Sequence, residues 1–451
     1  MIIMAKNRLE TESIGKLILQ LAIPTVLAQL VNLLYNIVDR IYVGRIPGEG
    51  SLALAGLGVT FPIILLVSAF ASLAGMGGAS RAAVCMGAKD NERAEKILGN
   101  STMLLIVFAV VLAVVFIITK DPILLTFGAS ETTLPYASDY ITIYLIGTVF
   151  VQISLGLNMF ITNQGFSKTS MMTVCIGAII NIILDPIFIY GFNMGVKGAA
   201  LATIMSQAVS CIWVLRFLTG KKTILKIKLK NLIPDWNIIG LILSLGVSPF
   251  IMQMTECLIQ LTFNNGMLKY GNDLYVALMS ILFSLTQLIW MPLQGFAQGA
   301  QPVVGYNYGA GRIDRVKKAF KVQFTISLAF SLVAIGIVEL FPKIFMGLFT
   351  NDPELINIGV NTTRLFLAGM ALMGAQSACQ QTFLALGEAK ISVFLACLRK
   401  VILLLPLALI LPKIGGLGVW GLLLAEPVSD VIAATCTTTM FAIRSKKLLK
   451  K

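Results

Sequence analysis

The chain has 451 residues, of which 57% are hydrophobic and only 12% are charged, and its mean hydropathy is +0.87. This composition excludes a soluble globular protein and indicates an integral membrane protein. The formal net charge is +14, but the basic residues lie mostly between apolar segments, which is typical of positive-inside anchors rather than of a nucleic-acid-binding surface. The chain has no histidine, so histidine-based catalysis and histidine metal sites are excluded.

Twelve apolar segments are long enough to cross a bilayer as helices. They lie at residues 14–44, 51–79, 97–119, 133–162, 169–190, 197–219, 237–265, 273–300, 320–342, 354–385, 390–411 and 417–443. The longest charged stretch, with five lysines from Lys221 to Lys230, separates the sixth segment from the seventh and predicts a solvated cytoplasmic loop on anionic lipid. We therefore predict an all-α membrane protein with an N-terminal lobe at 1–220, a linker at 221–235 and a C-terminal lobe at 236–451.

The distribution of basic residues predicts the orientation in the membrane. The N-terminal segment and the even-numbered loops hold most of them, including Lys6, Arg81, Arg93, Lys168, Arg315 and Lys390, and a last cluster begins at Arg444. The odd-numbered loops hold single basic residues such as Arg45 and Lys120. Because basic loops remain on the cytoplasmic side, we expect a multi-pass plasma-membrane protein with both termini in the cytoplasm.

The two halves of the chain repeat each other. Gly87-Ala88 matches Gly309-Ala310 and Gly165 matches Gly387, both at an offset of 222 residues, and Pro24 matches Pro249 at an offset of 225. Several pairs at nearly one offset indicate an internal duplication. Since each half has six segments, an even number, the repeats are predicted to share one orientation and to enclose a cavity at their interface.

The stretch from Asn181 to Pro186 lies inside the fifth apolar segment. Asn181 and Asp185 are four residues apart and share one face of a helix, and Pro186 cannot donate a hydrogen bond to the carbonyl of Ile182. A carboxylate in the middle of a membrane costs roughly 2.5–3.5 kcal/mol on insertion scales, so it usually faces a protein interior and serves a function. These hard oxygen atoms predict a site for a proton or a small cation such as Na⁺.

The first apolar segment carries a polar stripe at helical spacing, formed by Asn32, Tyr35, Asn36 and Asp39. Asp39 is predicted to face Asp185 as a second carboxylate of the cation site; the alternative is that it lies at the outer end of the segment and pairs with Arg40. The other three residues of the stripe are candidates for substrate contact. Pro24 either kinks this helix permanently or lets it switch between straight and bent forms.

The duplication indicates which half carries the cation site. Asp39 corresponds to Asn264 and Asp185 to Leu407, so the carboxylate pair is absent from the second half. Each of Tyr140, Asn158 and Thr203 is by itself more typical of an interhelical packing or hydrogen-bonding residue than of a ligand. They become candidates for further oxygen atoms of the site because they share the first half with the two acids.

The second half has charges of its own, at Glu256, Arg399, Lys400, Glu426 and Asp430. Arg399 and Glu426 are predicted to form a buried ion pair. Glu256 has no acidic neighbour in the sequence, so it either faces the central cavity, where it would attract a cationic substrate, or it is paired.

These motifs resemble the multidrug and toxic compound extrusion (MATE) transporters, and within them the DinF-like branch. The likeness covers nearly the whole chain, and its most specific parts are the loop Gly87-Ala88-Lys-Asp-Asn-Glu-Arg93, the Asn181–Pro186 stretch and the following Gly195-Val-Lys-Gly198. The resemblance implies two lobes around a V-shaped cavity. It implies an N-lobe cation site at Asp39, Asn158, Asn181, Asp185 and Thr203, with Tyr140 beside it and Pro24 as the bending proline. The tenth segment has no acid in its body, so the C-lobe cation site of another branch of the family is not expected.

The resulting hypothesis is a secondary-active antiporter, acting as a monomer, that exports cationic amphipathic compounds in exchange for H⁺ or Na⁺ and needs no other cofactor. The first alternative is a flippase for lipids or lipid-linked sugars of the same superfamily, which would need a more cationic cavity. The second is a polytopic membrane enzyme, but neither a catalytic constellation nor a Walker motif is present in the sequence.

Overall fold

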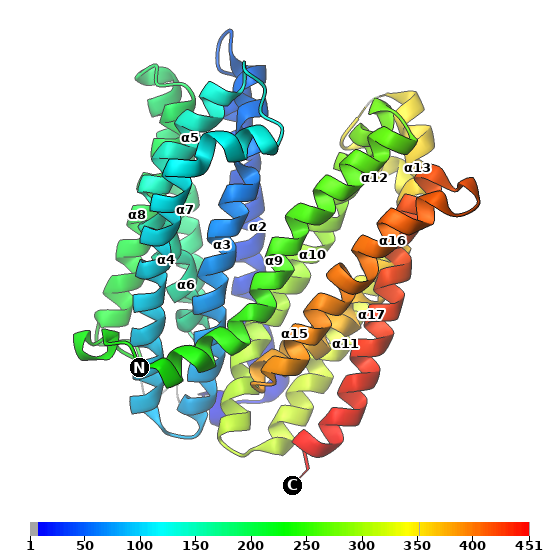
Figure 1. The fold of residues 1–451 in the computed structure, drawn as a ribbon. Helices are drawn as coiled ribbons and strands as arrows, with labels where there is room; N and C mark the ends of the chain where they lie inside the picture. Colours follow the sequence, from blue (N-terminus) through cyan, green and yellow to red (C-terminus); the bar gives the residue numbers. More distant parts are fainter. Residues whose placement is uncertain (1–7, 351, 451) are drawn as a thin grey trace.

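A computed structural model describes residues 8–350 and 352–450, and this part of the chain contains helices and loops but no strand. Figure 1 shows long helices that run side by side along most of the molecule. Eleven of them are long and apolar enough to cross a membrane, and a bent pair supplies a twelfth crossing. The prediction of an all-α protein with twelve crossings is therefore confirmed.

The crossings lie close to the predicted segments. In the first half they are α2 (Ile14–Gly44), α3 (Gly50–Gly87), α4 (Asn91–Thr126), the pair α5 (Leu134–Ile146) and α6 (Thr148–Asn163), α7 (Ser167–Pro186) and α8 (Val196–Thr219). In the second half they are α9 (Trp236–Tyr270), α10 (Asp273–Gly309), α11 (Ile313–Leu340), α13 (Pro353–Leu367) with α14 (Met373–Ala385), α15 (Ala389–Cys397) with α16 (Leu405–Ile410), and α17 (Gly418–Leu448). A short extra helix, α12 (Pro342–Gly347), follows α11.

Several crossings are interrupted by bends or irregular turns. The fourth bends by 60° between α5 and α6, at Gly147. The fifth continues beyond Pro186 as a π-helical turn, η1 (Ile187–Gly191), as expected where a proline removes a backbone donor. The eleventh contains a π-helix, η4 (Leu398–Leu404), between α15 and α16. Irregular turns at these depths free backbone groups, which must then face protein or water.

The duplication is visible in the backbone as well as in the sequence. Residues with positive φ recur at almost the same offset: Lys89 (64°) and Gly311 (69°), Gly165 (87°) and Gly387 (81°), and Gly195 (55°) and Gly418 (50°). Each pair ends one helix and turns the chain into the next. Corresponding loops in the two halves therefore have the same left-handed conformation, which favours glycine at five of these six positions.

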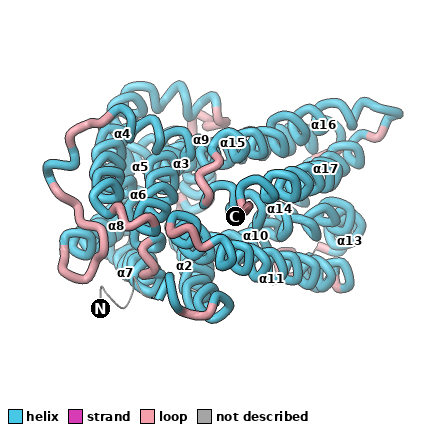
Figure 2. Tube along the Cα trace, turned by 90° about the horizontal axis from the view of Figure 1, so that it is seen from below, coloured by secondary structure: helices cyan, strands magenta, loops and turns pink. Residues whose placement is uncertain are grey.

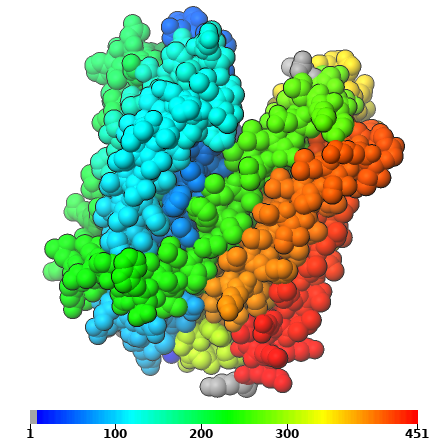
Figure 3. All heavy atoms as spheres, viewed as in Figure 1, coloured from blue at the N-terminus to red at the C-terminus, as the bar shows by residue number. Residues whose placement is uncertain are grey.

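The helices form two groups that diverge toward one end of the molecule. In Figure 1, α2–α8 form one arm and α9–α17 form the other, and Figure 3 shows a V-shaped opening between the arms. The arms meet at the end that carries the C-terminus. Figure 2 shows this arrangement from below, with α2 between α7 of its own arm and α10 of the other.

Glycines allow close contact where the arms meet. A Cβ atom on Gly87 of α3 would overlap the carbonyl oxygen of Tyr306 on α10, and a Cβ atom on Gly309 would overlap the carbonyl oxygen of Val84. These two contacts are equivalent under the 222-residue offset. They show that α3 and α10 cross about a pseudo-twofold axis, with backbone against backbone.

The linker at 221–235 is not the freely solvated loop that its lysines predict. The side-chain oxygen Oε1 of Gln164, at the end of α6, accepts hydrogen bonds of 2.8 Å from Thr223 Oγ1 and from the backbone nitrogens of Ile224 and Leu225. Glu95 on α4 also pairs with Lys228. The lysine side chains at 221, 222 and 230 are exposed, whereas the linker backbone is docked against the N-terminal arm.

Candidate functional site

Two carboxyl groups from different helices meet inside the N-terminal arm. Asp39 lies on α2 and Asp185 on α7, and their side chains are close enough to share a hydrogen bond when one of them carries a proton. Asp39 is 8% exposed and Asp185 is fully buried. The position of Asp39 near the end of α2 raised the alternative of a surface pair with Arg40, but the structure places Asp39 against Asp185.

Neutral polar groups surround this acid pair. Asn181, one turn before Asp185 on α7, donates from Nδ2 to Asp185 Oδ1 at 3.3 Å and lies 3.5 Å from Thr203 Oγ1 on α8. Thr203 in turn bonds to the Tyr140 hydroxyl of α5. Four helices thus contribute side chains to one pocket, which we call the acid pocket, defined by Asp39, Tyr140, Asn181, Asp185 and Thr203.

The acid pocket contains more acceptor oxygens than donors. Within the described part of the chain, Asp39 Oδ1, Asp185 Oδ2 and Asn181 Oδ1 are buried and have no hydrogen-bond partner. Buried polar atoms without a partner are rare and costly, and here all three are oxygens. Such a group of oxygens suits a proton shared between the carboxylates or a hard cation such as Na⁺.

Tyrosines enclose the acid pocket. Tyr35, one turn before Asp39 on the polar stripe of α2, lies close to both carboxyl groups. This residue, which the sequence suggested for substrate contact, therefore also borders the acid pocket. Tyr144 stacks on Tyr140 with ring centroids 6.4 Å apart, and the Tyr190 hydroxyl in η1 donates to the Tyr42 carbonyl of α2 at 2.6 Å. Sequence reasoning missed Tyr144 and Tyr190; the four-residue spacing of Tyr140 and Tyr144 was the only local signal for the first.

Two predicted residues, Asn158 and Asn36, lie outside the acid pocket. Asn158 donates from Nδ2 to the carbonyl of Ser170, about three turns before Asn181 on α7 and roughly 16 Å away along the helix, so the structure does not bring it to the acid pocket. Asn36 is exposed, and its Nδ2 donates to the backbone of Asn32 at 2.6 Å. Asn36 therefore points away from the buried acids, and Asn32, one turn earlier on α2, is half-buried.

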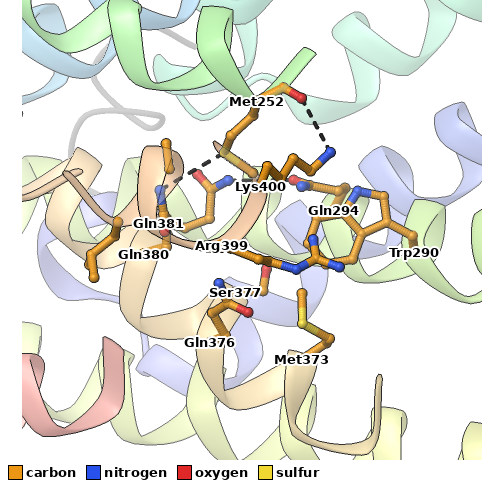
Figure 4. Close-up of a pocket in the computed structure, with 12 residues that line it drawn as sticks. Met252, Trp290, Gln294, Met373, Gln376, Ser377, Gln380, Gln381, Arg399 and Lys400 are labelled. Carbon is orange, nitrogen blue, oxygen red and sulfur yellow. Dashed lines mark hydrogen bonds between the residues drawn. The ribbon is translucent and has the colours of Figure 1, made fainter. Parts of the chain in front are cut away.

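Glu256 of α9 is paired in this conformation. Its carboxylate forms an ion pair with Lys400 of η4, and it retains 37% side-chain exposure. Lys400 and Arg399 line a pocket in the C-terminal arm together with glutamines, Trp290 and two methionines, and Figure 4 shows these side chains converging. Of the two expectations for Glu256, the structure shows the paired one: Lys400 compensates the charge of its carboxylate.

Pro24 lies at the contact between the arms. It is buried inside α2, which remains one continuous helix. The next residue, Thr25, donates from Oγ1 to the Gly295 carbonyl of α10 at 2.5 Å. A proline at this position cannot donate to the carbonyl of Gln20, so α2 is weakened where it touches the other arm.

Comparison with known proteins agrees with this architecture. The MatE family model matches the chain twice, over residues 24–187 and 249–410, which also reproduces the internal duplication. The multidrug export protein MepA of Staphylococcus haemolyticus is 26% identical over 426 residues, covering 94% of this chain and 93% of MepA.

Two solved structures superpose closely on this fold. A multidrug resistance MATE family transporter of the MOP superfamily in its outward-facing conformation gives a TM-score of 0.91 at 25% identity, with 98% of both chains covered. A MOP superfamily transporter from Pyrococcus furiosus, described as having a binding pocket of reversed polarity that suggests a different function, gives the same values. The chain, as its motifs predict, belongs to the MatE family of multi-pass membrane transporters.

Proposed function

We propose that this chain is a secondary-active antiporter that exports amphipathic organic cations in exchange for H⁺ or Na⁺. The observation that carries the proposal is the acid pocket, in which Asp39 and Asp185 are buried against each other beside unpaired oxygens. Two ionised carboxylates repel strongly in a low-dielectric interior, so the empty pair favours a different arrangement of α2 and α7 from the pair that holds a cation. Family membership and the V-shaped opening support transport as the function.

Coupling requires that the cation prefers one arrangement of the arm. Protonation or Na⁺ binding removes the repulsion between the acids and allows α2 to approach α7. The conformational shift cannot exceed the difference in cation affinity between the two arrangements. Substrates enter the cleft between the arms, so a change in the packing of α2 alters the wall of the substrate path.

Export from proteoliposomes with only one gradient imposed tests the proposed function. A fluorescent organic cation is loaded, and either a pH gradient or a Na⁺ gradient is applied alone, with an ionophore that collapses the gradient as control. Export driven by one gradient identifies the coupling ion. If neither gradient accelerates export above that of protein-free liposomes, the chain is not such an antiporter.

The orientation in the membrane gives a further prediction. We expect the even-numbered loops, and with them both termini, to face the cytoplasm, so that the V opens to the outside. In a cysteine-free background, cysteine at Lys230 should resist an impermeant thiol reagent applied to whole cells, whereas cysteine at Glu131, also exposed, should react. The reverse pattern of labelling would contradict the orientation.

Pro24 is proposed as the hinge that carries the change in α2. Pro24→Ala restores the backbone hydrogen bond to Gln20 and should hold α2 straight, so we expect gradient-driven export to fall severalfold while cation binding to the acid pocket is retained. Pro62→Ala, in α3 of the same arm, is the matched control. Equal losses of export in both variants would show a general effect of removing proline rather than a hinge at Pro24.

A further inference from the structure

The C-terminal arm contains a second buried cluster of charges. The proposed antiport mechanism, which relies on the acid pocket, gives this cluster no role. Arg399 of η4 lies between two acids of α17: its Nη2 is 3.1 Å from Glu426 Oε1, and its Nε is 2.7 Å from Asp430 Oδ1. Glu426 and Asp430 are four residues apart, so they share one face of α17. All three side chains are at least 89% buried.

The charges of this cluster do not balance. The charged groups that act on Glu426 and Asp430 are Arg399, Lys400 and Glu256. Lys400 is itself paired with Glu256. Two cations therefore face three carboxylates. With every group ionised, the cluster carries a net charge of −1 within the membrane-spanning helices. Burying one uncompensated charge costs several kcal/mol, so the cluster needs one more positive charge.

The unpaired atoms indicate where that charge belongs. Among the described residues, Glu426 Oε2 and Asp430 Oδ2 are buried without a hydrogen-bond partner, although the other oxygen of each carboxylate binds Arg399. From α10, the Trp290 ring covers the guanidinium of Arg399 at 5.9 Å. The two free oxygens are therefore the atoms of the cluster that lack a hydrogen-bond donor.

The cluster is connected to a polar pocket. Arg399 and Lys400 line this pocket with Gln376 and Ser377 of α14 (Figure 4). Gln376 is 5% exposed and Ser377 is 4% exposed, yet Gln376 Oε1 and Ser377 Oγ have no hydrogen-bond partner in the described part of the chain. Unsatisfied polar groups in a pocket are the usual position of ordered water. Such water would give protons a path to Arg399 and the acids behind it.

We propose that Glu426 and Asp430 form a second proton-binding site, which takes up one proton on one of the two carboxyl groups and which is separate from the acid pocket. A proton suits this place better than a metal cation, because Arg399 already lies 2.7–3.1 Å from both acids and would repel a cation held beside them. Among the described residues, this cluster also has two free carboxylate oxygens, fewer than the three free oxygens of the acid pocket, and hard cations are held by several oxygen ligands.

Protonation of this site changes the attachment of α17 to η4. With one carboxyl group neutral, Arg399 retains one strong charge-assisted partner instead of two. The proton is thus linked to the contact between the eleventh and twelfth crossings, in the arm where the sequence predicts no cation site. A chain of this kind would carry one titrating centre in each arm.

Infrared difference spectroscopy of the purified protein in lipid nanodiscs tests this site without any transport measurement. The background variant Asp39→Asn/Asp185→Asn removes the signals of the acid pocket, so the outcome does not depend on the proposed antiport. When the pH is lowered from alkaline to neutral, the background should develop a C=O band of a protonated, buried carboxyl group. Adding Glu426→Gln or Asp430→Asn, each close in shape to the original residue, should abolish that band.

A matched pair of substitutions at Glu256 tests the charge balance while leaving both acids of α17 in place. Glu256→Gln leaves two cations facing two carboxylates, so the band should disappear at neutral pH; Glu256→Asp keeps the charge and should keep the band. A background without the band, a band that survives Glu426→Gln and Asp430→Asn alike, or a band that Na⁺ removes at constant pH would each overturn the proposal.

Discussion

Replacing Asp185 by asparagine is expected to abolish gradient-driven export while leaving the protein folded and inserted. Asp185 is fully buried, and its carboxylate shares the acid pocket with Asp39. Asparagine has nearly the same shape but cannot ionise, so binding and release of the cation no longer change the charge of the pocket. Without a difference in cation affinity between the two arrangements of α2 and α7, the gradient cannot drive the cycle.

The measurement is dye export from proteoliposomes under an imposed gradient, with thermal unfolding as a check of the fold. Asp139→Asn is the matched control, because Asp139 lies on α5 of the same arm but is 48% exposed in a surface pair with Lys197. It should export at the rate of the unmodified protein. The repeat equivalents Asn264→Ala and Leu407→Ala should have much weaker effects on coupling. Export at the original rate by Asp185→Asn would refute coupling at the acid pocket.

Replacing Arg399 by glutamine is expected to lower the free energy of unfolding by about 3–5 kcal/mol, more than the other substitutions considered, because it leaves buried carboxylates without their cation. Glu426 and Asp430 lose their salt-bridge partner, and only Lys400, already paired with Glu256, remains nearby. The loss should be greater at alkaline pH, since at acidic pH the stranded carboxylates take up protons and become neutral.

Thermal unfolding of the purified protein at two pH values checks this expectation. Arg216→Gln provides the control, because Arg216 is exposed on α8 and its change should alter stability by no more than about 0.5 kcal/mol. The triple variant Arg399→Gln/Glu426→Gln/Asp430→Asn removes all three charges and should recover most of the lost stability, since replacing a whole buried ionic group costs far less than removing one partner. A triple variant as unstable as Arg399→Gln would show that packing, not charge, explains the loss.

Much of this architecture follows from the sequence because its causes are local. Runs of apolar residues determine the crossings, and α2 at Ile14–Gly44 matches its predicted segment. Other helices extend beyond the apolar run, as α3 does to Gly87 where the prediction ends at residue 79, because a helix can continue past the apolar residues into polar ones. The spacing of Asn181 and Asp185 places them on one helix face, and Pro186 ends regular α-helix one residue later. Motifs that recur at an offset of 222 residues predict the duplication, and the turns at Gly165 and Gly387 have the same positive-φ backbone conformation.

Contacts between helices could not be read from sequence patterns. Helical periodicity tells which residues share a face, but not which face of another helix they meet or at what depth. Asn158 therefore fell outside the acid pocket, although its residue type and its segment fitted. Glu256 pairs with Lys400, which lies 144 residues further along the chain, and Arg399 pairs with Asp430 as well as with the predicted Glu426.

The linker shows the same limit for loops. Most lysine side chains of the linker are exposed, as the sequence predicts. Its backbone, however, donates hydrogen bonds to Gln164 at the end of α6. The crossings and the helix faces that carry acids follow from the sequence, because they depend on residues within a few turns of one another, and the duplication follows from motifs that recur along the chain. Which buried charges are neutralised and which oxygens remain free became known from the packing of the helices, because that balance depends on helices that are far apart in the sequence.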